Sequence, residues 1–136
     1  MAENNYPAIL KISLVLYAIL CIVYGLGYIF FPNALVEMAG DESVYHGWLQ
    51  WPGGVILALG IGALMVLMKP KNQGIFVTVM ALGSLLVGLA LIYAWLTPLE
   101  GRNSWFTAVP CITILVVSAL LWLSRQQAKE LLFRGD

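Results

Sequence analysis

The 136-residue chain is 61% hydrophobic and 10% charged, carries no formal net charge, and has a mean hydropathy of +0.88. A soluble domain carries about 25% charged residues, so this composition excludes a water-facing globule. The seven Lys and Arg, balanced by seven Asp and Glu, are too few and too scattered to bind a phosphate backbone. Nucleic acid is therefore excluded as a partner, and the lipid bilayer is the partner that the composition indicates.

Four long stretches of the chain contain no Asp, Glu, Lys or Arg, and each is long enough to cross a bilayer as a helix. Prolines sharpen the boundaries, because proline is tolerated in the first turn of a helix and tends to end it elsewhere. We predict an all-α polytopic membrane protein, a four-helix transmembrane bundle in which residues 1–136 form one domain. The predicted spans are residues 8–31, 49–68, 74–96 and 105–123.

The connection between the first two spans is the longest segment outside the predicted spans. Its residues 32–40 begin with Pro32 and end with Gly40, a pattern typical of a short helix. Leu35 and Met38 would then face lipid while polar residues face water. This pattern predicts a short interfacial helix in the first outer loop.

The distribution of basic residues predicts the orientation of the chain. An even number of spans places both termini and the turn at residues 69–73 on one side, together with six of the seven Lys and Arg. Only Arg102 falls on the other side. Because basic residues stay on the cytoplasmic face, we predict cytoplasmic N- and C-termini in the cell or inner membrane.

A polar stripe follows one face of the first predicted span. Tyr17, Cys21, Tyr24 and Tyr28 recur in steps of four, three and four, which places them within one quadrant of a helix. A tyrosine hydroxyl in hydrocarbon needs a partner, so this face should point into the bundle. Two interpretations stay open: hydrogen-bonded packing between helices, or one wall of a cavity for a lipophile with a polar head.

The fourth predicted span carries Thr107, Cys111, Ser118 and Trp122 on one face, so it could supply the opposite wall if it packs on the first span. Cys21 and Cys111 could then be neighbours. A redox role is disfavoured, because buried free cysteine usually behaves as a small apolar residue and no basic group is near in sequence. The predicted ligand-binding residues are Tyr17, Cys21, Tyr24, Tyr28, Cys111, Ser118 and Trp122.

Small residues predict where helices approach closely. The second span has Gly54, Ala58 and Gly62 spaced by four, and the third has Ser84 and Gly88. Such patterns let two backbones meet in a membrane. Since a short turn joins these two spans, the simplest use is a seam between them. The alternative use is contact with another chain, in a homo-oligomer or a larger membrane complex.

Groups that could support chemistry are scarce. Lys11 is the only acidic or basic residue within the predicted spans, and it lies near a helix end, where a lysine can reach the headgroups. His46 stands near Asp41 and Glu42, but one histidine in an exposed loop is more typical of a solvated segment than of a metal site. We predict no catalytic set and no metal site. No cofactor motif is evident, and a bound lipid or quinone is the one cofactor-like ligand that we consider.

Residues 25–35, Gly-Leu-Gly-Tyr-Ile-Phe-Phe-Pro-Asn-Ala-Leu, and the Trp-Pro-Gly-Gly at residues 51–54 with the small-residue run at 58–63 resemble the DoxX-like small membrane proteins. The shared features are a helix ending in aromatic-Phe-Pro, a short surface helix and a glycine-rich second span, and they cover the first half of the chain. The resemblance implies a four-helix membrane bundle. It also implies a possible link to quinones, because some relatives are subunits of quinone-linked oxidoreductases. It transfers no catalytic residue.

Two functional hypotheses follow from the sequence. The leading one is a non-catalytic accessory or assembly subunit that packs against itself or against a larger membrane complex through its small-residue faces. The alternative is a binder or carrier of a small lipophilic ligand, such as a lipid, quinone or pigment, held between the first and fourth spans.

Overall fold

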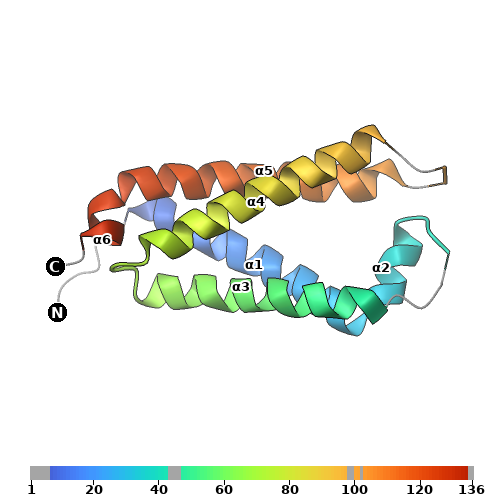
Figure 1. Ribbon diagram of the computed structural model, residues 1–136, viewed down its shortest axis with the longest axis horizontal. Helices are drawn as coiled ribbons and strands as arrows, with labels where there is room; N and C mark the ends of the chain where they lie inside the picture. Colours follow the sequence, from blue (N-terminus) through green and yellow to red (C-terminus); the bar gives the residue numbers. More distant parts are fainter. Residues whose placement is uncertain (1–6, 43–46, 98–99, 102, 135–136) are drawn as a thin grey trace.

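The computed structural model describes residues 7–42, 47–97, 100–101 and 103–134 (Figure 1). All regular structure in these residues is helical, and four of the helices are long and apolar enough to cross a membrane. These four are α1 (Ala8–Phe30), α3 (Gln50–Met68), α4 (Gly74–Leu96) and α5 (Ser104–Gln127). The shorter elements are α2 (Pro32–Met38), the 3-10 turn η1 (Gly47–Leu49) and α6 (Lys129–Phe133). The predicted all-α four-helix membrane bundle is confirmed.

Helix α5 begins at an Asn103 cap, whose side chain accepts a hydrogen bond from the Trp105 backbone N–H at 3.2 Å. It continues to Gln127, whereas the sequence predicted an end at residue 123. The helix extends beyond Arg125, its first charged residue, because the Arg125 guanidinium has stabilising partners inside the bundle. Its Nε donates to Thr78 Oγ1 at 2.6 Å, and its Cζ stands 5.1 Å from the ring centroid of Trp122.

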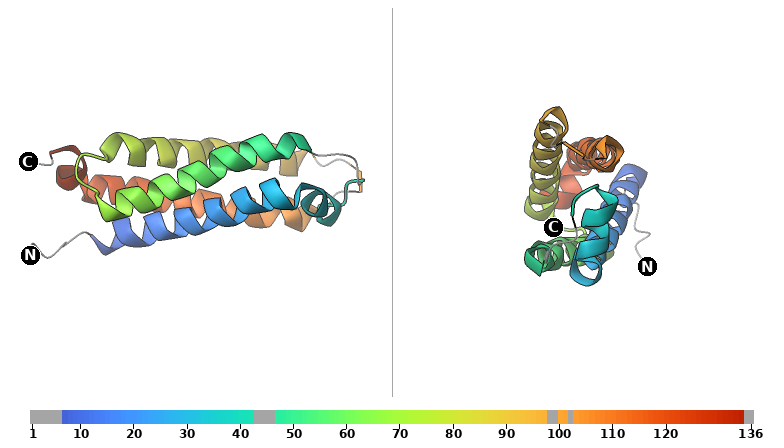
Figure 2. Two further views of the ribbon diagram at one scale, coloured as in Figure 1. Left: turned by 90° about the horizontal axis from the view of Figure 1, so that it is seen from below. Right: turned by 90° about the vertical axis from the view of Figure 1, so that its right-hand side faces the viewer.

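The four membrane helices form two tightly packed antiparallel pairs, α1 with α3 and α4 with α5, and contacts between α1 and α5 join the pairs (Figures 1 and 2). Helices α3 and α4 follow one another in the chain, yet they touch little and diverge away from their connecting turn (Figure 1). The prediction of a small-residue seam between the second and third spans is therefore wrong. Helix α3 instead packs against α1, and helix α4 packs against α5.

Glycines bring the backbones of α1 and α3 into contact. A Cβ atom added at Gly25 would lie 2.8 Å from the backbone nitrogen of Leu57, and one at Gly53 would lie 3.0 Å from the Gly25 carbonyl oxygen. At Gly60, an added Cβ would lie 2.9 Å from the Cβ of Cys21. This is the small-residue packing that associates helices in lipid, and it uses a different face of α3 from the predicted one.

The predicted small-residue face of α3 points mostly away from the bundle. Gly54 and Ala58 are exposed, and a Cβ added at Gly54 meets nothing within 4 Å. Gly62 is the exception, because an added Cβ would lie 2.7 Å from the ring of Phe76 near the α3–α4 turn. Gly54 and Ala58 therefore remain on the lipid-facing surface of the single chain.

The α4–α5 seam combines close packing with hydrogen bonds. Ser118 Oγ donates to the Ala81 carbonyl at 2.9 Å, and Cys111 Sγ lies 3.7 Å from the Gly88 carbonyl. A side chain at Gly88 would collide with Leu115. Thus Gly88 does serve a helix seam, as its residue type predicted, but its partner is α5.

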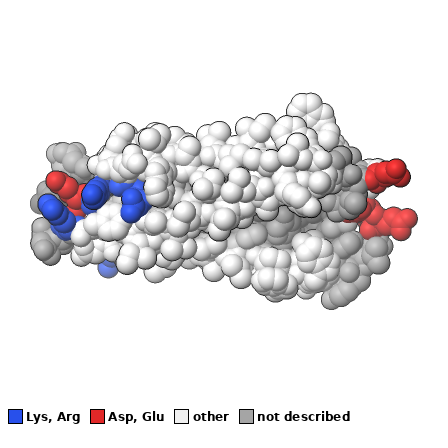
Figure 3. Space-filling view, turned by 45° about the horizontal axis from the view of Figure 1, so that its top comes forward, with Lys and Arg blue, Asp and Glu red and all other residues white. Residues whose placement is uncertain are grey.

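Charge divides the bundle into two ends (Figure 3). All Lys and Arg among the described residues lie where α1 begins, at the α3–α4 turn, and at the end of α5 with α6, and we call this the basic end. The opposite acidic end carries Glu37, Asp41, Glu42 and Glu100, whereas Glu130, the other acidic residue that the structure describes, lies in α6 at the basic end. The described basic residues are Lys11, Lys69, Lys71, Arg125, Lys129 and Arg134.

The core of the bundle lies toward the basic end. Leu14, Val77 and Leu121 from three different membrane helices are fully buried there, together with Leu132 of α6. Ser13 Oγ donates to Ser124 Oγ at 3.1 Å, which links α1 to α5 inside this core. The basic half of the bundle is thus filled with side chains.

Candidate functional site

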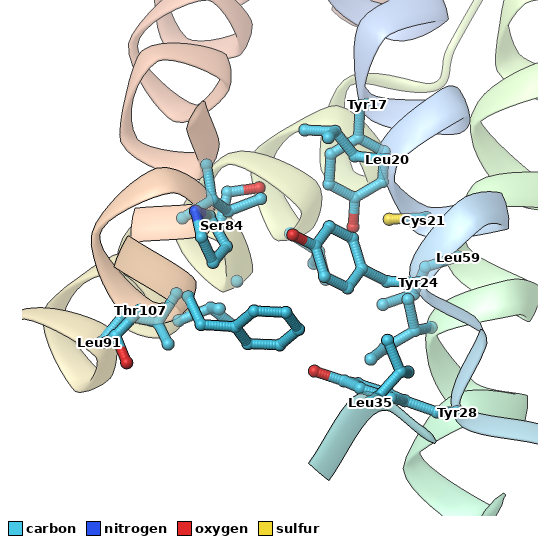
Figure 4. Close-up of a pocket in the computed structure, with 17 residues that line it drawn as sticks. Tyr17, Leu20, Cys21, Tyr24, Tyr28, Leu35, Leu59, Ser84, Leu91 and Thr107 are labelled. Carbon is cyan, nitrogen blue, oxygen red and sulfur yellow. The ribbon is translucent and has the colours of Figure 1, made fainter. Parts of the chain in front are cut away.

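A cavity of about 330 Å³ lies between the membrane helices, in the half of the bundle toward the acidic end. Its lining comes from α1, α3, α4 and α5, with one residue from α2. The cavity exists because the two helix pairs diverge beyond the packed core. Figure 4 shows its walls, with α1 facing α4 and α5 across the space.

Helix α1 contributes a polar wall. Tyr17, Cys21, Tyr24 and Tyr28, four residues that the sequence placed on one face, all line the cavity. In Figure 4 the three tyrosine hydroxyl groups point from α1 into the space. The Tyr17 hydroxyl lies beside the thiol of Cys21, and the rings of Tyr24 and Tyr28 are tilted by 59° with centroids 6.1 Å apart.

Two of these hydroxyl groups have no partner in the part of the chain that the structure describes. Among the described residues, no hydrogen bond is made by the hydroxyl of Tyr24 or Tyr28, and both side chains are half-buried. A polar group left without a partner in apolar surroundings costs about 1–3 kcal/mol. This wall is therefore ready to donate hydrogen bonds to an acceptor inside the cavity.

The facing wall offers a backbone acceptor. Phe106 and Pro110, one turn apart in α5, both line the cavity. Proline has no N–H, so the Phe106 carbonyl lacks its usual helical donor. Ser84 of α4 also lines the cavity, but its hydroxyl is occupied because it donates to the Met80 carbonyl at 2.8 Å.

Helix α2 crosses the acidic end of the bundle (Figures 1 and 2). Leu35 lines the cavity, and its Cδ1 would lie 3.1 Å from a Cβ added at Gly27 of α1. The Asn103 backbone N–H donates to the Ala39 carbonyl at 3.0 Å, which ties the end of α2 to the start of α5. The expectation that Leu35 faces lipid is wrong, whereas Met38 is 56% exposed.

The residues predicted from the fourth span lie elsewhere. Cys111 and Ser118 are buried in the α4–α5 seam, and Trp122 lies near the basic end, half-exposed beside Arg125. The structure thus brings the four α1 residues together and leaves these three outside the lining. Both cysteines are free thiols in different surroundings. Thr107, which the sequence placed on the same face as these three α5 residues, does line the cavity. The rest of the α5 wall, which sequence reasoning missed, was marked by Pro110, the one proline inside this helix.

The chemistry of the cavity is that of a neutral binding site. None of the residues that line it is Asp, Glu, Lys, Arg or His. In the part of the chain that the structure describes, no three potential metal ligands come together. His46 lies outside the described residues. The lining can hold an apolar molecule and orient an uncharged group that accepts hydrogen bonds.

Comparisons of the chain with protein-family models, with curated proteins and with solved structures find no match. The candidate site is therefore defined by the geometry of its own residues.

Proposed function

We propose that this membrane protein binds a small lipophilic molecule with an uncharged, oxygen-bearing head. One observation carries the proposal: the hydroxyls of Tyr24 and Tyr28 face an apolar cavity and have no partner among the described residues. In surroundings of low dielectric constant, a hydrogen bond from such a group is favourable because water does not compete for it.

The size and lining of the cavity support the same conclusion. Small-molecule sites typically enclose about 300–1,000 Å³ and combine apolar walls with a few placed polar groups. A volume of about 330 Å³ lies near the lower limit of that range, enough for a head and the first part of a chain. A lipid, a pigment or a quinone has this general form.

Replacing Tyr24 by phenylalanine should lower the occupancy of the bound lipophile about threefold to tenfold, because one hydrogen bond is lost while the ring remains. Native mass spectrometry of protein extracted gently from its own membrane measures this occupancy. Tyr93→Phe is the matched control, because Tyr93 is 72% exposed on α4 and does not line the cavity.

The two variants separate a specific site from general lipid binding. Equal occupancy in wild type, Tyr24→Phe and Tyr93→Phe would contradict the proposed site. A wild-type spectrum with no retained small molecule, also after addition of lipid extract from the source membrane, would contradict the binding function as a whole.

A second candidate function is an accessory or assembly subunit. The observation that favours it is the exposed pair Gly54 and Ala58 on α3, a small-residue surface that no part of the described chain covers. Such a surface could accept a helix of another chain in a homo-oligomer or a larger complex. The same native mass spectra test this second function, because a bound partner chain would add protein mass. A spectrum that contains only the mass of a single chain would contradict the accessory function.

We also propose that the basic end, with both termini, faces the cytoplasm. The support is the concentration of all described Lys and Arg at that end (Figure 3). Green fluorescent protein fused after the last residue should then fluoresce, and alkaline phosphatase fused at the same place should be inactive. The reverse pattern would place the basic end outside.

A further inference from the structure

One side of the cavity reaches the lipid-facing surface. Val79 and Val87 of α4 line the cavity, and yet each is 52% exposed. On the other side of the same gap, Ile56 and Leu59 of α3 also belong to the lining. Helices α3 and α4 diverge from their turn (Figure 1). The exposure of these lining residues indicates that the cavity opens between the two helices toward the hydrocarbon of the bilayer.

Gly83 lies in the middle of this opening. It follows Val79 by one helical turn and precedes Val87 by one turn, and it lines the cavity. A Cβ added at Gly83 would meet nothing within 4 Å. The glycine therefore does not serve a helix seam, unlike Gly88 on the same helix, and its lack of a side chain keeps the gap wide.

The two directions along the bundle axis and the two through the helix seams are obstructed. The core at the basic end is filled by residues such as Leu14, Val77 and Leu121. At the acidic end, Leu35 of α2 covers the space. The α1–α3 and α4–α5 seams are closed by direct backbone approach or by hydrogen bonds across them. On the remaining side, between α1 and α5, the lining residues are buried or half-buried. The α3–α4 gap, where Val79 and Val87 are each 52% exposed, is thus the most open route.

We infer that the α3–α4 gap is a lateral portal, through which an uncharged single-chain amphiphile of the monoacylglycerol type enters from the bilayer. This inference rests on the proposed binding function. The ester and hydroxyl oxygens of such a head accept hydrogen bonds from Tyr24 and Tyr28, and a hydroxyl can donate to the Phe106 carbonyl. The chain leaves past Gly83 into the lipid.

The ligand class follows from the lining. No ionisable Asp, Glu, Lys, Arg or His borders the cavity, so a charged head would be desolvated there without a counter-ion, which is strongly unfavourable. A cavity of about 330 Å³ accepts a compact head but not two acyl chains. A neutral head with one chain meets both conditions.

The test uses the full chain reconstituted in phosphatidylcholine vesicles. Donor vesicles supply a monoacylglycerol with a photoactivatable diazirine on its acyl chain, samples are illuminated at increasing times, and intact mass spectrometry reports the labelled fraction. We expect saturable labelling of the wild-type protein. A fatty acid and a fatty amine with the same diazirine chain carry a charged head. With these probes the labelled fraction of the protein should be at least about tenfold lower than with the monoacylglycerol.

Substitutions at the portal should lower the rate of photolabelling and leave the final labelled fraction unchanged. Gly83→Leu should lengthen the half-time of labelling about tenfold relative to Gly83→Ala, because its side chain obstructs the gap. Val79→Phe, at the rim of the same gap, should act in the same direction. Ala90→Leu is the control, since Ala90 is exposed on α4 and lies outside the lining.

Each outcome decides one part of the inference. Labelling that is saturable but equally fast in Gly83→Leu, Val79→Phe and wild type would overturn the portal and leave the binding function standing. A lower plateau without slower labelling in Gly83→Leu would also overturn the portal, because the side chain would then fill the site itself. Equal labelling by the charged analogues would overturn the ligand class. Absence of saturable labelling by all three probes in the wild type would overturn both the ligand class and the portal, while the native mass spectra decide the binding function itself.

Discussion

Replacing Gly25 by alanine is expected to lower the free energy of unfolding by about 1–3 kcal/mol, although the change adds a single methyl group. The new Cβ would lie 2.8 Å from the backbone nitrogen of Leu57 and 3.0 Å from the carbonyl oxygen of Gly53. Backbone atoms cannot rotate away as the end of a side chain can, so α1 and α3 must separate. Titration with sodium dodecyl sulfate in mixed micelles, followed by circular dichroism, measures the loss.

Gly54→Ala is the matched control on the facing helix. A Cβ at Gly54 meets nothing within 4 Å, and alanine favours the helical state by about 1 kcal/mol relative to glycine. This variant should therefore be as stable as the wild-type protein, or slightly more stable. If Gly25→Ala and Gly54→Ala unfold at the same detergent fraction, the close approach of α1 and α3 is wrong.

The second large effect is expected at Leu121, which is 0% exposed in the core near the basic end. Leu121→Ala should destabilise the protein by about 2–5 kcal/mol through the cavity that it leaves. We expect a value in the lower part of this range, because the lipid around an unfolded helix is as apolar as the core, so the loss is mainly one of packing contacts. The same detergent titration applies.

Leu123 provides the comparison for this substitution. It lies two positions further along α5 and is 47% exposed toward lipid, so Leu123→Ala removes the same atoms without opening a cavity. We expect a change well below that of Leu121→Ala. A larger effect at Leu123 than at Leu121 would mean that α5 is rotated relative to the described packing.

Sequence alone predicts the elements of this fold well, because the absence of charge over four long stretches leaves few alternatives in a chain of this composition. It does not predict which helices pair. On α3, Gly53 and Gly60 form one small-residue face, and Gly54 with Ala58 forms another. Both faces have apolar surroundings in a membrane, so the pattern that distinguishes inside from outside in a soluble helix is absent. Only the structure selects the face with Gly53 and Gly60.

The candidate site is also predictable from the sequence only in part. The α1 wall is predictable, since three tyrosines on one face of an apolar helix are polar enough to mark the inside of the bundle. The α5 wall is predictable only at Thr107, because Cys111 and Ser118 on the same predicted face are small as well as weakly polar. Small size suits a helix seam, and the seam with α4 is where both residues lie. The resemblance to DoxX-like proteins stays a prediction.

The pairing of α1 with α3 and of α4 with α5 also bears on how the chain is made. Each pair joins membrane helices that follow one another in sequence, so the first hairpin can assemble in the bilayer while the second is still on the ribosome. The second hairpin then docks through α1 and α5, and α6, which follows α5 in the chain, covers the core at the basic end. The binding cavity, enclosed by both hairpins, would therefore be completed only in this final docking step.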